Sequence, residues 1–167
     1  HYCLTLQGRQ GIGKTRLLKA LFRDWYIAME DSLDDTHAAD AIQKAWCCEL
    51  EELRATRKAE INAVKSFISA SSDTRRFAYE RKARKIRRHC VFVATCNDSQ
   101  FLADRTGNRR FPILKCQAQK CNFDKLTDEY IRQVWAESFE KFKALFAERF
   151  DNNKLQLSTD AQEYFAD

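Results

Sequence analysis

Apolar residues along the chain fall into two patterns, which predict alternating strands and helices. Residues 1–6 and 91–96 form short apolar runs, and the second run is rich in β-branched residues, as is typical of buried parallel strands. Residues 16–22 and 59–69 instead place apolar side chains at helical spacing. Together these patterns predict an α/β fold with a mainly parallel sheet.

Three shorter segments complete the predicted core. Residues 45–53 form a short apolar strand that ends in acidic residues, and residues 111–114 form another strand. Residues 25–29 are apolar enough for a strand or for the last turns of the preceding helix, and the pattern leaves both open. A further helix is expected over residues 38–44, after an acidic segment.

The last third of the chain is predicted to be helical. Thr127 is a good N-cap, and Asp128 and Glu129 follow it in the first turn. The apolar residues of this helix predict a stripe that packs on the core or forms a lid: Leu126, Tyr130, Val134, Phe142, Leu145 and Phe146. We therefore expect a core over residues 1–122 and a helical extension of the same domain over residues 123–167.

Composition narrows the class of protein. A chain of 167 residues that is 44% hydrophobic suits one folded domain with a substantial core. No apolar run approaches the ~20 residues of a membrane helix, and no signal-peptide pattern is present. Because the first residue lies almost on the first predicted strand, we expect a fragment of a longer protein. The seven cysteines include no C-x-x-C pair, which favours a reducing cytoplasm; Cys47, Cys48, Cys90 and Cys96 are expected inside strands.

The strongest motif lies between the first strand and the first helix. Residues 8–15 match the phosphate-binding pattern G-x-x-x-x-G-K-[ST], and three of the four glycines of the chain lie there. Glycines allow backbone N–H groups to converge on phosphates, and the helix N-terminus attracts negative charge. Lys14 is expected to reach the β- and γ-phosphates of ATP, and the Thr15 hydroxyl to bind Mg²⁺. The predicted nucleotide contacts are Gly8, Arg9, Gln10, Gly11, Ile12, Gly13, Lys14, Thr15 and Arg16.

Acidic residues at the end of the strand over residues 45–53 are candidates for the metal and the water. Glu49 is the candidate for holding Mg²⁺. Glu52 is the better candidate for activating the attacking water, and Glu51 the lesser one. The identity of the catalytic base among Glu49, Glu51 and Glu52 stays open.

A basic segment over residues 75–88 is a candidate nucleic-acid contact. It holds eight Lys and Arg against the single acid Glu80, whereas the whole chain carries a net charge of +5. Clustered cations bind phosphates, and the interleaved Phe77 and Tyr79 suit base stacking. The alternatives are a solvated basic face and arginines that contact nucleotide in a neighbouring subunit. The basic residues are Arg75, Arg76, Arg81, Lys82, Arg84, Lys85, Arg87 and Arg88.

Two further polar groups follow in the chain. Asn97 comes directly after the strand over residues 91–96, where it could position water at the γ-phosphate or cap the next turn. Gly107 allows a tight turn that presents Arg109 and Arg110, and such arginines suit the charge on a transferring phosphoryl group. Two surface arginines at a turn are the plainer alternative.

In this order the motifs resemble the virulence-associated E family, which comprises predicted phage and plasmid ATPases related to superfamily 3 helicases and the AAA+ class. Members are often fused to a primase domain. The resemblance covers nearly the whole chain, and its most specific run is Thr-Gly-Asn-Arg-Arg-Phe at residues 106–111. The other matching stretches are residues 8–15, 48–53, 65–69 with Asp73 and Arg76, 78–81, 91–97 and 134–137.

The resemblance implies roles for several of these residues. Asn97 corresponds to the sensor asparagine of the third helicase motif, and Arg109 or Arg110 to an arginine finger that reaches a neighbour's ATP; Arg81 is a further candidate. It also implies a P-loop three-layer sandwich, a homo-oligomeric and hexameric ring, DNA (single-stranded) as partner, and an upstream primase domain. Two departures from the wider pattern are the separation of Glu49 from Glu52 and the sequence of residues 78–81, which replaces a Pro-Tyr-Gly-Arg-like run.

The predicted function is therefore that of a Mg²⁺-dependent ATPase of the superfamily 3 helicase type, which acts on DNA in mobile-element replication. Two alternatives belong to other classes. One is an ATP-binding switch or assembly module without helicase activity. The other is a small-molecule P-loop kinase in which the basic segment would serve as a lid.

Overall fold

The computed structural model describes residues 2–29, 41–51, 58–75, 81–97, 110–117 and 122–149. The chain divides into two compact units, His1–Lys120 and Cys121–Asp167. In the described residues, the first unit contains a parallel sheet, two longer helices, a separate hairpin and a helical segment at residues 41–44, where a helix was predicted over residues 38–44; the second contains one long helix. None of the helices in the described residues combines the length and the apolar character needed to cross a membrane.

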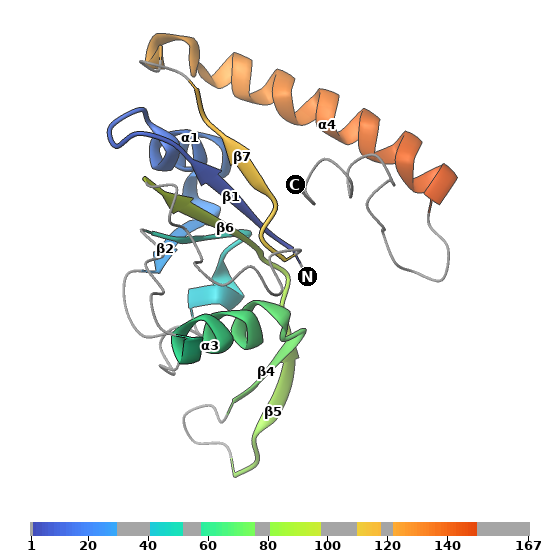
Figure 1. Ribbon diagram of the computed structural model, residues 1–167. Helices are drawn as coiled ribbons and strands as arrows, with labels where there is room; N and C mark the ends of the chain where they lie inside the picture. Colours follow the sequence, from blue (N-terminus) through green and yellow to red (C-terminus); the bar gives the residue numbers. More distant parts are fainter. Residues whose placement is uncertain are drawn as a thin grey trace. The chain divides into compact units, whose positions relative to one another are not determined.

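The first unit is built on a five-stranded sheet in the order β2-β3-β6-β1-β7 (Figure 1). All four pairings in this sheet are parallel. The strand β6, which comes late in the chain, therefore lies between β3 and β1. The predicted mixed α/β fold with a mainly parallel sheet is confirmed. The strands are β1 (Cys3–Gln7), β2 (Tyr26–Met29), β3 (Cys47–Leu50), β6 (Val91–Cys96) and β7 (Ile113–Lys115).

Apolar clusters cover both faces of the sheet, because successive residues of a strand point to opposite sides. On one face, Leu18 of α1 (Lys14–Phe22) packs with Leu6, Cys47 and Val93. On the other face, the helix α3 (Lys58–Ser69) contributes to a larger cluster. That cluster contains Val64, Ile68, Cys48, Leu50, Phe92, Ala94 and Phe111. Burial on both faces explains why the central strands read as continuous apolar runs.

Several boundaries differ from the predicted ones or settle an open choice. The segment 25–29 is mainly strand: a 3-10 turn, η1 (Arg23–Trp25), ends where β2 begins. The strand predicted over residues 111–114 begins only at Ile113, because Pro112 lacks the N–H that a paired strand residue donates. Its carbonyl oxygen instead accepts from Thr5 N at 2.8 Å. Cys90 was expected inside a strand but lies one residue before β6.

Most of the described part of the basic segment belongs to a two-stranded antiparallel hairpin that is separate from the main sheet and begins just before the segment. Its strands are β4 (Ser72–Arg75) and β5 (Arg84–Arg87), and Figure 1 shows them extending away from the sheet. Apart from Ile86, both strands consist of polar and charged residues, so no apolar pattern predicts them. Residues 76–80, which hold Phe77 and Tyr79, lie outside the described residues.

The second unit contains the turn η3 (Phe123–Lys125) and the helix α4 (Asp128–Arg149). The predicted N-cap is confirmed, since Thr127 Oγ1 accepts from Tyr130 N at 3.2 Å. Three residues of the stripe that was predicted to pack on the core or to form a lid, Tyr130, Phe142 and Leu145, are exposed. Ile131, which lies one position along and therefore about 100° around the helix from Tyr130, is buried. The buried side of the helix therefore differs from the predicted stripe by one residue position at Tyr130 and Ile131.

Candidate functional site

The loop between β1 and α1 depends on its glycines for its backbone path. Gly11 has a φ of 80° and Gly13 a φ of 94°, both in the left-handed region that favours glycine. Gly13 also begins the helix, because its carbonyl accepts from Leu17 N at 2.9 Å. At Gly8 the reason is space: a Cβ atom there would lie 2.7 Å from the carbonyl oxygen of Cys116. Each glycine of the motif thus has a backbone reason of its own.

Lys14, the first residue of α1, folds its side chain back over this loop. Its Nζ donates to the carbonyl oxygens of Gly8 at 2.7 Å and Arg9 at 3.1 Å, and to Asn97 Oδ1 at 2.9 Å. Three acceptors therefore hold the ammonium group above the loop. An anion bound at the loop would lie beside this charge.

Asn97 reaches Lys14 because of the strand order. β6 lies beside β1, and Gly8 N donates to the carbonyl oxygen of Cys96 at 3.1 Å. The residue after Cys96 is thereby brought next to the loop. The contact with Lys14 joins residues 83 positions apart in the sequence, whereas residues 98–100, which follow Asn97, lie outside the described residues.

Glu49 lies at the centre of a buried cluster of hydroxyl groups. The residue has no exposed surface, and its Oε1 accepts from Thr15 and from Thr95, both at 2.7 Å. Its Oε2 accepts from the Tyr26 phenol at 2.6 Å. The period-two alternation of β3 puts Glu49 on the same face as Cys47, and hence on the face covered by α1.

This cluster has the donor set of a magnesium site. Among the described residues, no Lys, Arg or His forms an ion pair with Glu49. Hydroxyl donors stabilise a buried carboxylate but leave its charge uncompensated, which is costly unless a cation is bound. Carboxylate and hydroxyl oxygens are ligands that Mg²⁺ accepts. Thr15 and Glu49 therefore fit the metal that the loop motif implies.

Two members of the cluster, Tyr26 and Thr95, were not predicted from the sequence. In the sequence, Tyr26 belongs to an apolar segment and Thr95 to a strand that is predicted to be buried. Burial and the hydrogen bond to Glu49 raise the pKa of Tyr26, so its phenol remains a donor over the physiological range. A polar residue within an otherwise apolar strand was the available signal, but its partners depend on which strands become neighbours.

A cavity of about 520 Å³ opens beside the loop. This volume lies in the range of small-molecule sites. Glu51 contributes to its wall, and Glu51 Oε1 lies 3.5 Å from the Tyr26 hydroxyl. Glu52 is outside the described residues. The residues that line the cavity are Gln10, Gly11, Gly13, Lys14, Thr15, Arg16, Lys19, Glu51, Thr95 and Asn97.

Of the two arginines of the predicted finger, the structure describes Arg110, which does not line this cavity. Arg110 lies just before β7, and its Nε donates to Ser69 Oγ at the end of α3, at 3.2 Å. It is absent from the described lining of the cavity. Arg109 lies outside the described residues. The position of Arg110 therefore does not support a role in this chain's own site.

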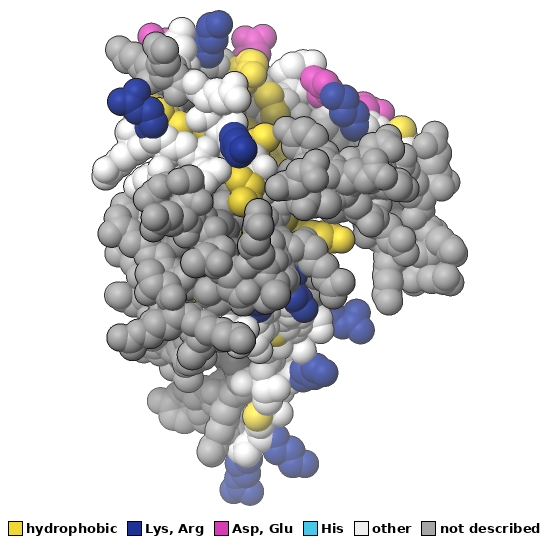
Figure 2. Space-filling model, in the orientation of Figure 1, with side chains coloured by type: hydrophobic (Ala, Val, Ile, Leu, Met, Phe, Trp, Pro, Cys, Tyr) yellow, Lys and Arg dark blue, Asp and Glu magenta, His cyan; other side chains and the backbone are white. Residues whose placement is uncertain are grey.

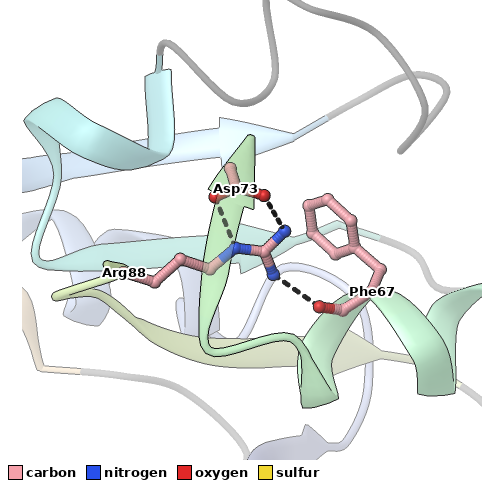
Figure 3. A network of polar contacts seen from close by, with 3 residues as sticks. All are labelled: Phe67, Asp73 and Arg88. Atoms are coloured by element: carbon pink, nitrogen blue, oxygen red, sulfur yellow. Dashed lines mark hydrogen bonds and ion pairs between the residues drawn. The ribbon is translucent and has the colours of Figure 1, made fainter. Parts of the chain in front are cut away.

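One arginine of the basic segment is buried, contrary to the expectation that all eight contact nucleic acid. Arg88 Nε donates to Asp73 Oδ2 at 2.7 Å, and its two other nitrogens donate to Asp73 Oδ1 and to the Phe67 carbonyl oxygen (Figure 3). Its side chain is only 5% exposed, and the guanidinium lies 4.5 Å from the centre of the Phe67 ring. Arg88 therefore anchors the base of the hairpin and does not belong to its outer surface.

The remaining described basic residues of this segment are exposed. Figure 2 shows their dark blue side chains at the lower end of the view, over the β4–β5 hairpin. Arg76 and the side chain of Arg75 lie outside the described residues. The exposed residues are Arg81, Lys82, Arg84, Lys85 and Arg87. We call these five residues the basic hairpin surface.

Comparison with known proteins places this fold and its motifs in a family. No curated protein sequence matches the chain significantly. The fold is similar to the apo structure of the NrS-1 C-terminal region, with a TM-score of 0.58 and 18% identity over 99% of this chain and 42% of that one. Two A-form apo structures of the same region give TM-scores of 0.52 and 0.53 at 19% identity, over 81% and 98% of this chain and 33% and 42% of those chains.

This chain thus spans less than half the length of the solved chains that it resembles. The structural likeness supports the parallel α/β fold described above. The sequence match is more specific, because the profile of the virulence-associated protein E-like domain covers residues 1–167. As its motifs predict, the chain belongs to the virulence-associated protein E-like domain family.

Proposed function

We propose that this domain is a Mg²⁺-dependent ATPase of the superfamily 3 helicase and AAA+ type, with a P-loop three-layer sandwich fold. One observation carries the proposal: Lys14 and Thr15 line one cavity at the glycine loop, and the Thr15 hydroxyl is hydrogen-bonded to the buried carboxylate of Glu49. A cation for the phosphates, a site for a metal and left-handed glycines are the parts that phosphoryl transfer from ATP requires.

The chemistry assigned to the site is hydrolysis of the γ-phosphate. Water attacks the γ-phosphorus in line, the bond to the β–γ bridging oxygen breaks, and the products are ADP and inorganic phosphate. Lys14 binds the β- and γ-phosphates and offsets their negative charge. Thr15 and Glu49 would hold Mg²⁺, which would supply further neutralisation of that charge. Asn97 orients the water, and Glu51 or Glu52 accepts its proton.

The proposed partner is single-stranded DNA, bound at the basic hairpin surface. Five exposed cations on one short hairpin form an electrostatic site for phosphates that does not depend on sequence. Combined with the family, this favours a role in the replication of phage or plasmid DNA, in the cytoplasm. An upstream primase domain, as the family resemblance implies, belongs to the same proposal.

The proposed assembly is a homo-oligomeric ring, hexameric by the same resemblance. Arg110 lies away from the described lining of the chain's own cavity, so it would act on a neighbour's ATP. Arginine supplied in trans stabilises the charge of the transition state. Arg109 and Arg81 are further candidates for this role.

The first test is steady-state ATP hydrolysis with and without single-stranded DNA. Lys14→Ala should lower turnover by about 100-fold or more, because it removes a charge that contacts the transferring group. Lys44→Ala is the matched control, since Lys44 is exposed and does not belong to the described cavity lining. Binding of ATP without any DNA-responsive hydrolysis would instead support the switch.

The second test separates action in trans from action within one chain. Lys14→Ala subunits carry an intact finger, whereas Arg109→Ala/Arg110→Ala subunits carry an intact ATP site. Each variant alone should be nearly inactive. Mixing them should restore part of the activity if a neighbour supplies the arginine, and no recovery on mixing at ring-forming concentrations would contradict the proposal.

A further inference from the structure

A tyrosine on the edge strand β2 lies between two carboxylates of the candidate site. The Tyr26 hydroxyl is 2.6 Å from Glu49 Oε2 and 3.5 Å from Glu51 Oε1. We propose that Tyr26 is a positioning residue for Mg²⁺: its phenol holds Glu49 in the orientation that binds the metal and leaves Glu51 to the cavity. This inference rests on the proposed function and adds a residue that no phosphate-loop motif contains.

The two oxygens of Glu49 are held unequally. Oε1 accepts from two threonines, whereas the described donor to Oε2 is the phenol alone. The terminal torsion of a glutamate is broad, so a carboxylate with one oxygen unrestrained samples other orientations. Removal of the phenol would therefore loosen the Glu49–Thr15 pair even though neither of these residues changes.

The phenol also distinguishes the two acids. A tyrosine has one O–H and can donate to one acceptor at a time. At 2.6 Å the Glu49 oxygen is at hydrogen-bond length, whereas the Glu51 oxygen at 3.5 Å is at the outer limit. Glu49 is thereby assigned to the metal, and Glu51, which lines the cavity, remains available as the base.

Packing of the Tyr26 ring against the core also keeps the phenol in place. The Tyr26 ring packs against the cluster of Leu6, Leu18, Cys47 and Val93 that joins α1 to the sheet. Parallel pairing sets Tyr26 opposite Cys47, two residues before Glu49. Because Phe retains this packing, Tyr26→Phe removes only the hydroxyl and should fold.

The experiment is a Mg²⁺ titration of the binding of a fluorescent ATP analogue, which needs no turnover. Tyr26→Phe should raise the half-saturating Mg²⁺ concentration by about 10- to 100-fold, the usual effect of losing a residue that orients a metal ligand. Binding of the analogue in EDTA should stay unchanged. Tyr2→Phe is the matched control, because it makes the same change at a tyrosine that is 50% exposed.

Each outcome decides between the two proposals. If the wild-type chain shows no Mg²⁺-dependent binding, the proposed function itself fails. If wild type is Mg²⁺-dependent and Tyr26→Phe has the same half-saturation, only the role of Tyr26 is overturned. Weaker binding in EDTA would overturn a role specific to the metal.

A second variant keeps the test decisive if Tyr26→Phe does not fold. Glu51→Gln leaves the Tyr26–Glu49 hydrogen bond in place and removes only the other carboxylate. It should leave the half-saturating Mg²⁺ concentration unchanged while it lowers turnover. A rise in that concentration as large as the one predicted for Tyr26→Phe would show that Glu51 holds the metal, and would overturn the assignment.

Discussion

The candidate site and the basic hairpin both carry charged side chains, but the structure holds them in opposite ways. At the site, the charges of Lys14 and Glu49 are each surrounded by three hydrogen-bond partners. On the hairpin, the basic surface is exposed, and the ion pair of Arg88 with Asp73 is buried beneath it. The candidate site depends on the fixed positions of a few hydrogen-bonded groups, whereas the hairpin depends on the number of exposed positive charges.

Two adjacent arginines show that the position of a residue decides whether its charge is buried or exposed. Arg87 and Arg88 are identical and adjacent, yet Arg87 is exposed and Arg88 is buried against Phe67 and Phe92. Counting charges treats the two alike. Their energetic roles differ because a buried ion pair leaves an uncompensated charge when one partner is removed, whereas an exposed charge is replaced by water.

The largest predicted effect is a loss of stability on replacing Arg88, compared with the same replacement at Arg87. Arg88→Ala should destabilise the domain by about 3 to 5 kcal/mol, because Asp73 would be left buried without its partner. Arg87→Ala removes the same charge and should change stability by no more than about 0.5 kcal/mol. Urea denaturation of both variants measures the difference. Equal stabilities would contradict the anchoring role of Arg88.

The second expected effect concerns the charge density of the hairpin. The triple variant Arg84→Gln/Lys85→Gln/Arg87→Gln should weaken single-stranded DNA binding by about 100-fold at 0.1 M salt and reduce the salt slope by about 2, since each phosphate contact contributes about 0.7. ATP binding should not change. Fluorescence anisotropy at several salt concentrations measures the slope.

A charge-matched triple variant provides the control for that experiment. Lys44→Gln/Lys115→Gln/Lys125→Gln removes three exposed cations from outside the hairpin. If it weakens DNA binding as much as the hairpin variant does, net charge and not the basic hairpin surface governs binding.

The smallest predicted effect is the stability cost of replacing a glycine of the loop at the candidate site, where the backbone has a positive φ. Gly11→Ala meets no atom within 4 Å, so its cost comes from the positive φ alone. That cost is about 1 to 2 kcal/mol for a residue with a Cβ atom. Thermal unfolding measures it, with Gln10→Ala as the control at the exposed neighbouring position. A neutral Gly11→Ala would show that the loop relaxes freely.

Much of the fold could be predicted because its signals are local. The apolar run of β6 and the helical spacing of α3 depend on the size and polarity of nearby residues. The glycine loop is local as well, since φ values at Gly11 and Gly13 are properties of single residues. The Arg88 anchor and the exposed face of α4 were missed, because burial there depends on residues that lie elsewhere in the chain or on a rotation of one helical position.

The sequence by itself determined the strand–loop–helix unit, the cation and hydroxyl that follow the glycines, and the acid of β3, because each belongs to one short segment with a strict spacing. Tertiary structure alone decided that β6 lies between β3 and β1, which brings Asn97 to Lys14 and Thr95 to Glu49. It also decided that Tyr26 joins the cluster. The apolar pattern of a strand shows that both of its faces are buried, but it does not show which strands become its neighbours, because these pairings join segments far apart in the chain.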